Sequence, residues 1–189
     1  MGVRIVKMRE YYTPAVVLGL NPRNDKDAQV ILYTKDLGKV SAIAKSIRKI
    51  TSKLAGHLRV GSLANVRLID AGGSYQLIDG LAFNSPHEGG EQLKLIAFLE
   101  SVIPKGQPDI RMWYTISEIF ESGIITPRIY RYLLQLMGFV RGGSEIPICQ
   151  GCRGEEDQVV YFYAPDIIFL CSGCLSRVRI DINETVPVS

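Results

Sequence analysis

The chain has 189 residues, of which 47% are hydrophobic and 22% are charged, and its formal net charge is +3. This apolar content excludes an intrinsically disordered chain, and no apolar run approaches the roughly 18–20 residues that cross a membrane. The first twelve residues mix charged and apolar side chains, without the continuous apolar segment of a signal peptide. We therefore expect a cytoplasmic protein with no membrane partner.

Short apolar runs separated by turn residues fill the chain as far as Leu81. Within residues 65–69, polar and apolar side chains alternate with the period of two that a strand requires. Long helical patterns are missing between most runs, which favours a small antiparallel barrel over a parallel sheet. The five expected strands are Pro14–Leu20, Ala28–Thr34, Lys39–Lys45, Leu63–Asp70 and Tyr75–Leu81, and Ser46–Gly61 is the longer connection.

Charge is distributed unevenly along the chain. Residues 1–80 hold 13 Lys and Arg against 6 Asp and Glu, whereas residues 81–189 hold 9 against 13. Between residues 35 and 59, only Asp36 opposes the cations, so this stretch predicts a surface that neutralises phosphates. The alternative is an ordinary solvated face. The candidate DNA-binding residues are Lys35, Lys39, Lys45, Arg48, Lys49, Lys53 and Arg59.

Three tyrosines near the first two strands are candidates for stacking on bases, namely Tyr11, Tyr12 and Tyr33. Tyrosines at such positions are more often half-buried sheet residues, so sheet packing is the competing interpretation.

From Ser85 onward, the apolar period becomes helical. Ser85-Pro86-His87-Glu88 resembles a capping box and predicts a helix that stops at Pro104. Its expected apolar face is Leu93, Ile96, Leu99, Val102 and Ile103. A second helix is expected over Asp109–Ser122, with Met112, Trp113, Ile116, Ile119 and Phe120 as its apolar stripe. A third begins near Pro127 and ends at Gly138.

All four cysteines lie in the last quarter of the chain, as two C-x2-C pairs separated by 18 residues. This spacing is typical of a four-cysteine zinc site. Between the pairs, Val159–Ala164 and Ile167–Leu170 predict a hairpin that turns at Pro165-Asp166. We therefore expect one structural Zn²⁺ per chain, because four thiolates leave no open position for water. The predicted ligands are Cys149, Cys152, Cys171 and Cys174.

Gly151 and Gly173 lie inside the two cysteine pairs, where small residues would let backbone N–H groups approach sulfur. Three other interpretations of the cysteines are weaker. Disulfides are improbable in a cytoplasmic chain, a thioredoxin-like pair needs a βαβ context, and a nucleobase-deaminase site needs an upstream H-x-E.

Catalytic motifs are missing from the sequence. It has no Walker A loop, no strand-linked G-x-G-x-x-G and no G-x-S-x-G, and its two histidines, His57 and His87, lie far apart. We therefore expect a protein that is not an enzyme and has no small-molecule substrate.

The order of these parts resembles the RecO family of recombination mediators. The residues that carry the resemblance at the N-terminus are Tyr12–Leu18 (YTPAVVL) and Ala28–Lys45. Further on, Leu133–Phe139 (LLQLMGF) before the first cysteine pair and Tyr163–Asp166 (YAPD) before the second are similar to that family's helix-to-zinc region. The resemblance spans about residues 12–175.

The resemblance implies an α+β protein with an N-terminal OB-fold barrel over residues 1–82. A short helical domain over 83–189 would then carry the zinc module at about 146–176. It also implies a non-enzymatic mediator that binds single- and double-stranded DNA, anneals strands and loads RecA with RecR on SSB-coated DNA. Localisation would be cytoplasmic, at the bacterial nucleoid.

The acidic balance of residues 81–148 favours protein contacts over phosphate contacts. The resemblance suggests that the acidic C-terminal tail of SSB docks near the third helix. Candidate partner-binding residues there are Arg128, Arg131, Tyr132 and Arg141. The alternative to a DNA-binding mediator is a zinc-containing protein–protein adaptor whose basic barrel face does not bind DNA.

Overall fold

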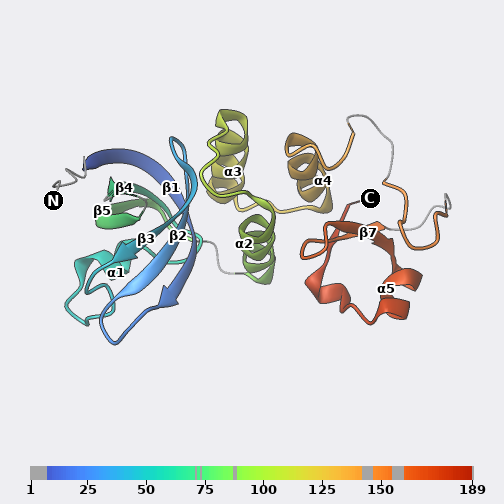
Figure 1. Cartoon of the computed structure of the whole chain (residues 1–189), viewed down its shortest axis with the longest axis horizontal. Helices are drawn as coiled ribbons and strands as arrows, with labels where there is room; N and C mark the ends of the chain where they lie inside the picture. The colour runs from blue at the N-terminus through green and yellow to red at the C-terminus, as the bar shows by residue number, and fades with distance from the viewer. Residues whose placement is uncertain are drawn as a thin grey trace, which may run out of the picture. The chain divides into compact units, whose positions relative to one another are not determined.

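The computed structural model describes residues 8–70, 72, 74–86, 89–141, 147–154 and 160–188. The chain divides into two compact units (Figure 1). The first comprises Met1–Glu100 and Pro104–Ile124, and the second comprises Ser101–Ile103 and Ile125–Ser189. The first unit thus continues beyond residue 82, the end of the barrel expected from the sequence, and takes in further helical segments.

Five strands of the first unit form a closed barrel in the order β1-β2-β3-β5-β4. All neighbouring pairs are antiparallel except β3 and β5, which run parallel. The barrel thereby confirms the predicted OB-fold architecture, with a single parallel pairing that the sequence did not reveal. The strands are β1 (Arg9–Pro22), β2 (Ala28–Thr34), β3 (Gly38–Ala44), β4 (Leu63–Asp70) and β5 (Tyr75–Asn84). A short helix, α1 (Lys53–His57), lies in the connection between β3 and β4.

Alternating side chains of the strands point into the barrel, as in β2, where Val30 and Leu32 are fully buried and Gln29 is exposed. Alanines contribute much of the interior, and their small size suits a narrow five-stranded barrel. The core cluster consists of Ala15, Val17, Ala28, Val30, Leu32, Val40, Ala42, Ala44, Ile47, Leu58, Ala64, Val66, Leu68 and Leu77.

The turn between β2 and β3 is joined to the segment that links helices α2 (Gly90–Val102) and α3 (Ile110–Ser122). Gly38 has a φ of +67°, and a Cβ at this position would lie 2.3 Å from the carbonyl oxygen of Gln107. The adjacent Lys39 accepts a hydrogen bond at its carbonyl from the N–H of Gly106, with an N–O distance of 2.9 Å. Only glycine permits this close approach of the two backbone segments.

Helix α3 (Ile110–Ser122) matches its prediction closely. Asp109 caps its N-terminus by accepting hydrogen bonds from the N–H groups of Arg111 and Met112. The buried residues are the five of the predicted stripe: Met112, Trp113, Ile116, Ile119 and Phe120.

Helix α2 (Gly90–Val102) differs from its prediction in two ways. It begins at Gly90, not near Ser85, and part of the expected capping sequence, residues 87–88, lies outside the described residues. The predicted apolar face is correct for Ile96, Leu99 and Ile103, which are buried, and wrong for Leu93, which is 63% exposed. Leu95 and Phe98, which the prediction left out, are also buried.

The second unit contains helix α4 (Pro127–Leu136) and a three-stranded sheet in the order β7-β6-β8. Strands β6 (Val160–Tyr163) and β7 (Ile168–Cys171) form the hairpin expected between the cysteine pairs. The sequence did not reveal strand β8 (Val186–Pro187), helix α5 (Ser172–Val178) or the short 3-10 helix Ile182–Glu184. Within the described part of the chain, every helix is too short or too polar to cross a bilayer.

Candidate functional site

Four cysteine side chains converge in the second unit, as the spacing predicts. Their sulfur atoms all lie within 4.8 Å of one another, and the Sγ atoms of Cys152 and Cys171 are 3.9 Å apart. A tetrahedron of thiolates at the Zn–S distance of about 2.3 Å has sulfurs about 3.8 Å apart. The cluster therefore has the dimensions of a four-thiolate metal site.

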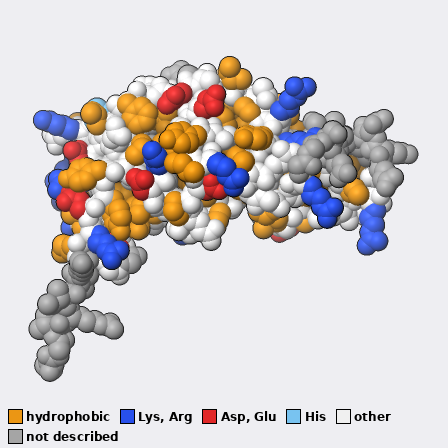
Figure 2. Space-filling view, turned by 90° about the horizontal axis from the view of Figure 1, so that it is seen from above, with side chains coloured by type: hydrophobic (Ala, Val, Ile, Leu, Met, Phe, Trp, Pro, Cys, Tyr) orange, Lys and Arg blue, Asp and Glu red, His pale blue; other side chains and the backbone are white. Residues whose placement is uncertain are grey.

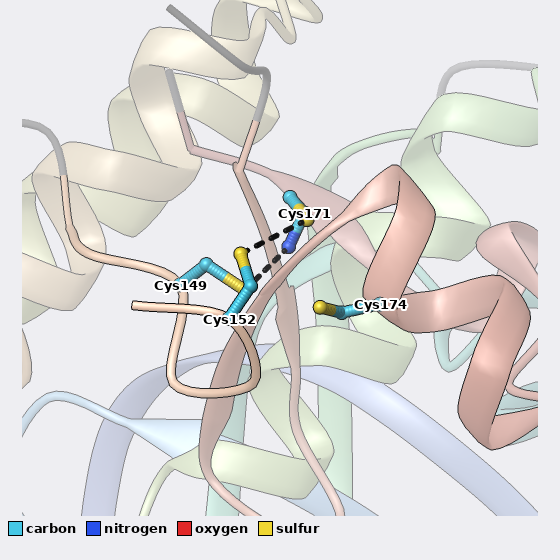
Figure 3. A group of neighbouring side chains, drawn as sticks. All are labelled: Cys149, Cys152, Cys171 and Cys174. Atoms are coloured by element: carbon cyan, nitrogen blue, oxygen red, sulfur yellow. Dashed lines mark hydrogen bonds between the residues drawn. The ribbon is translucent and has the colours of Figure 1, made fainter. Parts of the chain in front are cut away.

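The two halves of the cluster come from different local structures (Figure 3). Cys149 and Cys152 belong to a turn, Cys171 ends β7, and Cys174 lies in the first turn of α5. The turn is attached to β7 by a hydrogen bond from the Gln150 N–H to the Phe169 carbonyl, 2.8 Å long. In return, the Gln150 side-chain oxygen accepts from the N–H of Phe169 at 3.2 Å. Gln150 thus positions both ligands of the first pair, a role that the sequence did not indicate.

The glycines inside the two cysteine pairs are not equivalent. A Cβ on Gly151 would lie 2.8 Å from the sulfur of Cys174, so a larger residue there would displace that ligand. A Cβ on Gly173 would meet nothing within 4 Å. The expected approach of a backbone N–H to sulfur is found at Gly151, whose N–H is hydrogen-bonded to Cys149. At Gly173, the open space shows no steric need for glycine.

The sulfurs differ in their tendency to ionise. Burial opposes ionisation of Cys149, but the backbone N–H groups of Cys152, Cys171 and Gly151 outweigh it and lower the pKa of Cys149 to about 6. Desolvation, together with hydrogen bonds to the other three thiols, raises the pKa of Cys174 to about 12. Four thiolates within 4.8 Å of one another would repel strongly, so the fully ionised cluster needs a compensating cation. None of the four cysteines forms a disulfide, so all are available to hold a metal.

Five of the seven predicted DNA-binding residues are exposed at one end of the barrel. The connection between β3 and β4, including α1, carries all five: Lys45, Arg48, Lys49, Lys53 and Arg59. We call this set the basic connection.

The loop between β1 and β2 is hydrogen-bonded to the basic connection. The N–H of Arg48 donates to the Lys26 carbonyl at 3.0 Å, and the Arg48 guanidinium donates to the Asn24 carbonyl. The loop adds two exposed cations, Arg23 and Lys26, to this end of the barrel. Sequence reasoning missed them because Asp25 and Asp27 cancel their charge within the loop.

Asp27 itself has a structural role in this loop. Its carboxylate accepts hydrogen bonds from the Ser46 N–H at 2.8 Å and from the Asn24 side chain at 3.0 Å. These bonds, the Ser46 N–H first, lower the pKa of Asp27 below its usual range. The carboxylate therefore fixes the base of the basic connection.

The remaining two predicted residues, Lys35 and Lys39, are placed differently. Lys39 is only 7% exposed, and its ammonium donates to the Glu100 carbonyl. Desolvation lowers the pKa of Lys39, although Glu100 partly offsets this effect. Lys35 has its ammonium 5.5 Å from the centre of the Tyr114 ring. A buried ammonium with a carbonyl partner cannot meet a phosphate, so Lys39 is better described as a structural residue.

The three candidate stacking tyrosines also differ in their surroundings. Tyr33 is buried, and its hydroxyl donates to the Asp109 carbonyl at 3.4 Å. Burial raises the pKa of Tyr33 to about 12. Tyr11 packs edge-on against Tyr75 at the barrel core. Tyr12 alone of the three is exposed, at 70%.

Tyr12 lines a shallow groove of about 320 Å³ on the outside of β1, β4 and β5. The Arg67 guanidinium lies 5.5 Å from the centre of the Tyr12 ring and forms an ion pair with Glu10. Asp79 and Leu81 also line the groove, which therefore combines both charge signs with apolar surface. Apolar, basic and acidic side chains are likewise interspersed over the face that Figure 2 presents.

The predicted partner-binding residues lie in and after α4. Arg128, Tyr132 and Arg141 are exposed, and Arg131 is half-buried. Arg128 and Tyr132 are four residues apart on the helix and so share one face.

Comparison with known proteins identifies relatives of this chain. Residues 8–83 match the family model for the N-terminal domain of recombination protein O. A DNA repair protein RecO from Caldanaerobacter subterraneus subsp. tengcongensis is 26% identical, over 94% of this chain and 73% of its own length. RecO proteins from Dehalococcoides mccartyi and Thermodesulfovibrio yellowstonii are also 26% identical, over 90% and 95% of this chain and 72% and 76% of their own lengths. The resemblance drawn from the sequence motifs is thus confirmed: residues 8–83 match the RecO N-terminal family model, and the chain is similar to RecO proteins over most of its length.

Proposed function

We propose that this chain is a DNA-binding recombination mediator in DNA repair. The observation that carries the proposal is the exposed basic connection at one end of an OB-fold barrel, extended by Arg23 and Lys26. OB-folds bind single strands in basic grooves, and phosphate neutralisation gives an affinity that is independent of sequence. The similarity to RecO proteins supports the same function.

Its mechanism is the electrostatic capture and apposition of strands, without a chemical step. Single- and double-stranded DNA both present phosphates, so the same surface serves both, and holding two strands together promotes annealing. By analogy with the family, the protein acts with RecR to load RecA on SSB-coated DNA at the bacterial nucleoid.

The four cysteines hold one structural Zn²⁺ per chain. Two features support this assignment: sulfur separations of the right size and a glycine, Gly151, that makes room for the Cys174 sulfur. A closed shell of four thiolates leaves no coordination position for a substrate, so the metal stabilises the module and performs no catalysis.

The C-terminal tail of SSB docks near α4. An acidic tail that ends in apolar residues needs a cation beside apolar surface, and Arg128 and Tyr132 provide both on one helix face. Arg128→Glu and Tyr132→Ala should each weaken binding of an SSB-tail peptide in a fluorescence-anisotropy titration. Equal affinities for wild type and both variants would remove α4 from consideration.

DNA binding is tested by reversing three charges of the basic connection, in the variant Lys45→Glu, Arg48→Glu and Lys49→Glu. Its affinity for any duplex should fall more than about tenfold in 0.1 M salt. The slope of log affinity against log salt should become shallower by about three, and sequence preference should not change.

The matched control reverses three exposed arginines of the second unit, Arg128, Arg141 and Arg177. It changes the net charge equally and should leave the salt slope nearly unchanged. If both triple variants bind DNA like the wild type, the basic connection is a solvated face, and the protein–protein adaptor becomes the better description.

A further inference from the structure

Ile50 is an isolated, fully exposed apolar side chain between the cations of the basic connection, in the segment that joins β3 to β4. Its relative exposure is 105%, the highest value among the large apolar side chains of the described residues. It occupies a central position of a tight turn, which the Ser52 N–H closes by donating to the Lys49 carbonyl at 2.9 Å. Leaving such a side chain in water forgoes the free energy that its burial would release.

The turn that carries Ile50 is held firmly at its base. Ile47, three residues earlier, is 2% exposed and belongs to the barrel core. A preceding turn places the Lys49 N–H on the Ser46 carbonyl at 3.2 Å, and Arg48 is bonded to the β1–β2 loop. One isoleucine thus anchors the loop inside the barrel, while the other projects from its tip.

All charged residues near Ile50 in the β3–β4 connection are cations. Arg48 and Lys49 precede it, Lys53 follows it, and all three are exposed. The sequence contains no acidic residue between Asp36 and Asp70. Whatever contacts Ile50 must therefore tolerate several positive charges while offering an apolar surface. Duplex DNA has both features, with phosphates outside and base faces within the stack.

We infer that Ile50 is an apolar wedge that enters the base stack of duplex DNA while the surrounding cations hold the phosphates. This inference rests on the proposed DNA-binding function. Apolar side chains, isoleucine among them, insert between base steps in this way and partly unstack and kink the duplex. Because the contact is apolar, it adds affinity without changing the number of counterions released.

The test compares wild type, Ile50→Ser and Ile50→Leu on a duplex carrying 2-aminopurine, whose fluorescence rises when it unstacks. Wild type and Ile50→Leu should raise the fluorescence, and Ile50→Ser should not. Ile50→Ser should also lose about tenfold in affinity at every salt concentration, with an unchanged salt slope. Ile124→Ser, at a 65% exposed position outside the basic connection, is the matched control and should behave like wild type.

Equal affinity and equal fluorescence for wild type and Ile50→Ser would overturn the wedge. The wedge would also be overturned if Ile50→Ser bound anionic phosphatidylserine vesicles more weakly than wild type but bound duplex DNA equally well. Ile50 would then contact lipid and not bases. The triple charge reversal separates the two proposals. If it flattens the salt slope and Ile50→Ser has no effect, the wedge alone is wrong. If the slope does not change, the DNA-binding function is wrong as well.

Discussion

The barrel and the cysteine module reach stability by different means. The barrel core comprises fourteen buried residues, all apolar, drawn from the five strands and the connection that contains α1. The cluster around the cysteines has five buried residues, of which Cys149, Cys171 and Cys174 are themselves candidate ligands. A cluster that small offsets little of the entropy of ordering the chain around it, and small modules of this kind generally depend on a metal. We therefore expect apolar burial to stabilise the barrel and a bound metal to stabilise the cysteine module.

Removing the metal should have the largest effect on stability, and it should unfold the cysteine module while the barrel stays folded. Cys174→Ser, or a strong chelator, should unfold residues 147–188, because the binding free energy of structural zinc, about 10–16 kcal/mol, is folding free energy. Hydrogen exchange should show lost protection in the β6–β7 hairpin and unchanged protection in β1–β5.

Ser176→Ala, a change at an exposed position of the same helix, is the control for Cys174→Ser and should retain protection. Full protection of the hairpin after the metal is stripped would show that the module does not need it.

A cavity in the barrel core should destabilise the barrel and leave the cysteine module folded. Leu68→Ala removes a fully buried side chain and should lower the free energy of unfolding by about 2–5 kcal/mol, with one zinc per chain retained. Trp113 is the single tryptophan and packs against Tyr33, so its fluorescence in urea reports the first unit alone.

Leu81→Ala, at a 61% exposed position of the same barrel, should change the free energy of unfolding by less than about 0.5 kcal/mol. Loss of zinc from Leu68→Ala at neutral pH would mean that the two regions are not energetically separate.

The two glycines of the cysteine pairs offer a finer comparison within the module. Gly151→Ala places a methyl group against the Cys174 sulfur and should weaken zinc binding about 10- to 100-fold. Gly173→Ala meets open space and should bind zinc like wild type in competition with a chromophoric chelator. A similar loss in both variants would refute the distinction between them.

The smallest expected effect concerns the cap of α3. Asp109→Ala should lower the free energy of unfolding at pH 7 by about 1 kcal/mol. The N–H of Met112, with smaller help from Arg111, holds the pKa of Asp109 below its usual value of 3.8. The stabilisation is therefore present above that value and is lost as the pH falls through the lower, folded-state pKa.

Asp109→Asn keeps the cap and removes the charge, so its stability should not show this acid dependence. Urea unfolding of wild type and both variants, followed by Trp113 fluorescence from pH 7 to pH 2, measures the difference. Identical acid profiles for Asp109→Asn and wild type would assign the acid loss to other groups.

Local patterns in the sequence were enough to predict the structure wherever one physical signal dominates a short segment. The stripe from Met112 to Phe120 predicts the buried face of α3, and the paired cysteines predict their own convergence, because each signal is contained in a short segment. In α2, apolar residues surround the helix, so periodicity could not show that Leu93 faces solvent while Leu95 is buried.

Other features depend on contacts between distant segments. Lysine is almost never buried, so nothing local indicates that Lys39 reaches the Glu100 carbonyl. The addition of Arg23 and Lys26 to the basic connection likewise follows from hydrogen bonds between the β1–β2 loop and residues that lie some twenty positions later. Such pairings are set by the closure of the barrel.

The contact between Gly38 and Gln107 bears on where this protein can be cut. The RecO N-terminal match ends at residue 83, yet Gly38 and Lys39 are joined to backbone at 106–107. A fragment ending at residue 83 would expose the side of the barrel that packs there and would remove the carbonyl that holds the Lys39 ammonium. The smallest piece suitable for separate expression therefore runs to about residue 124, where the first compact unit ends.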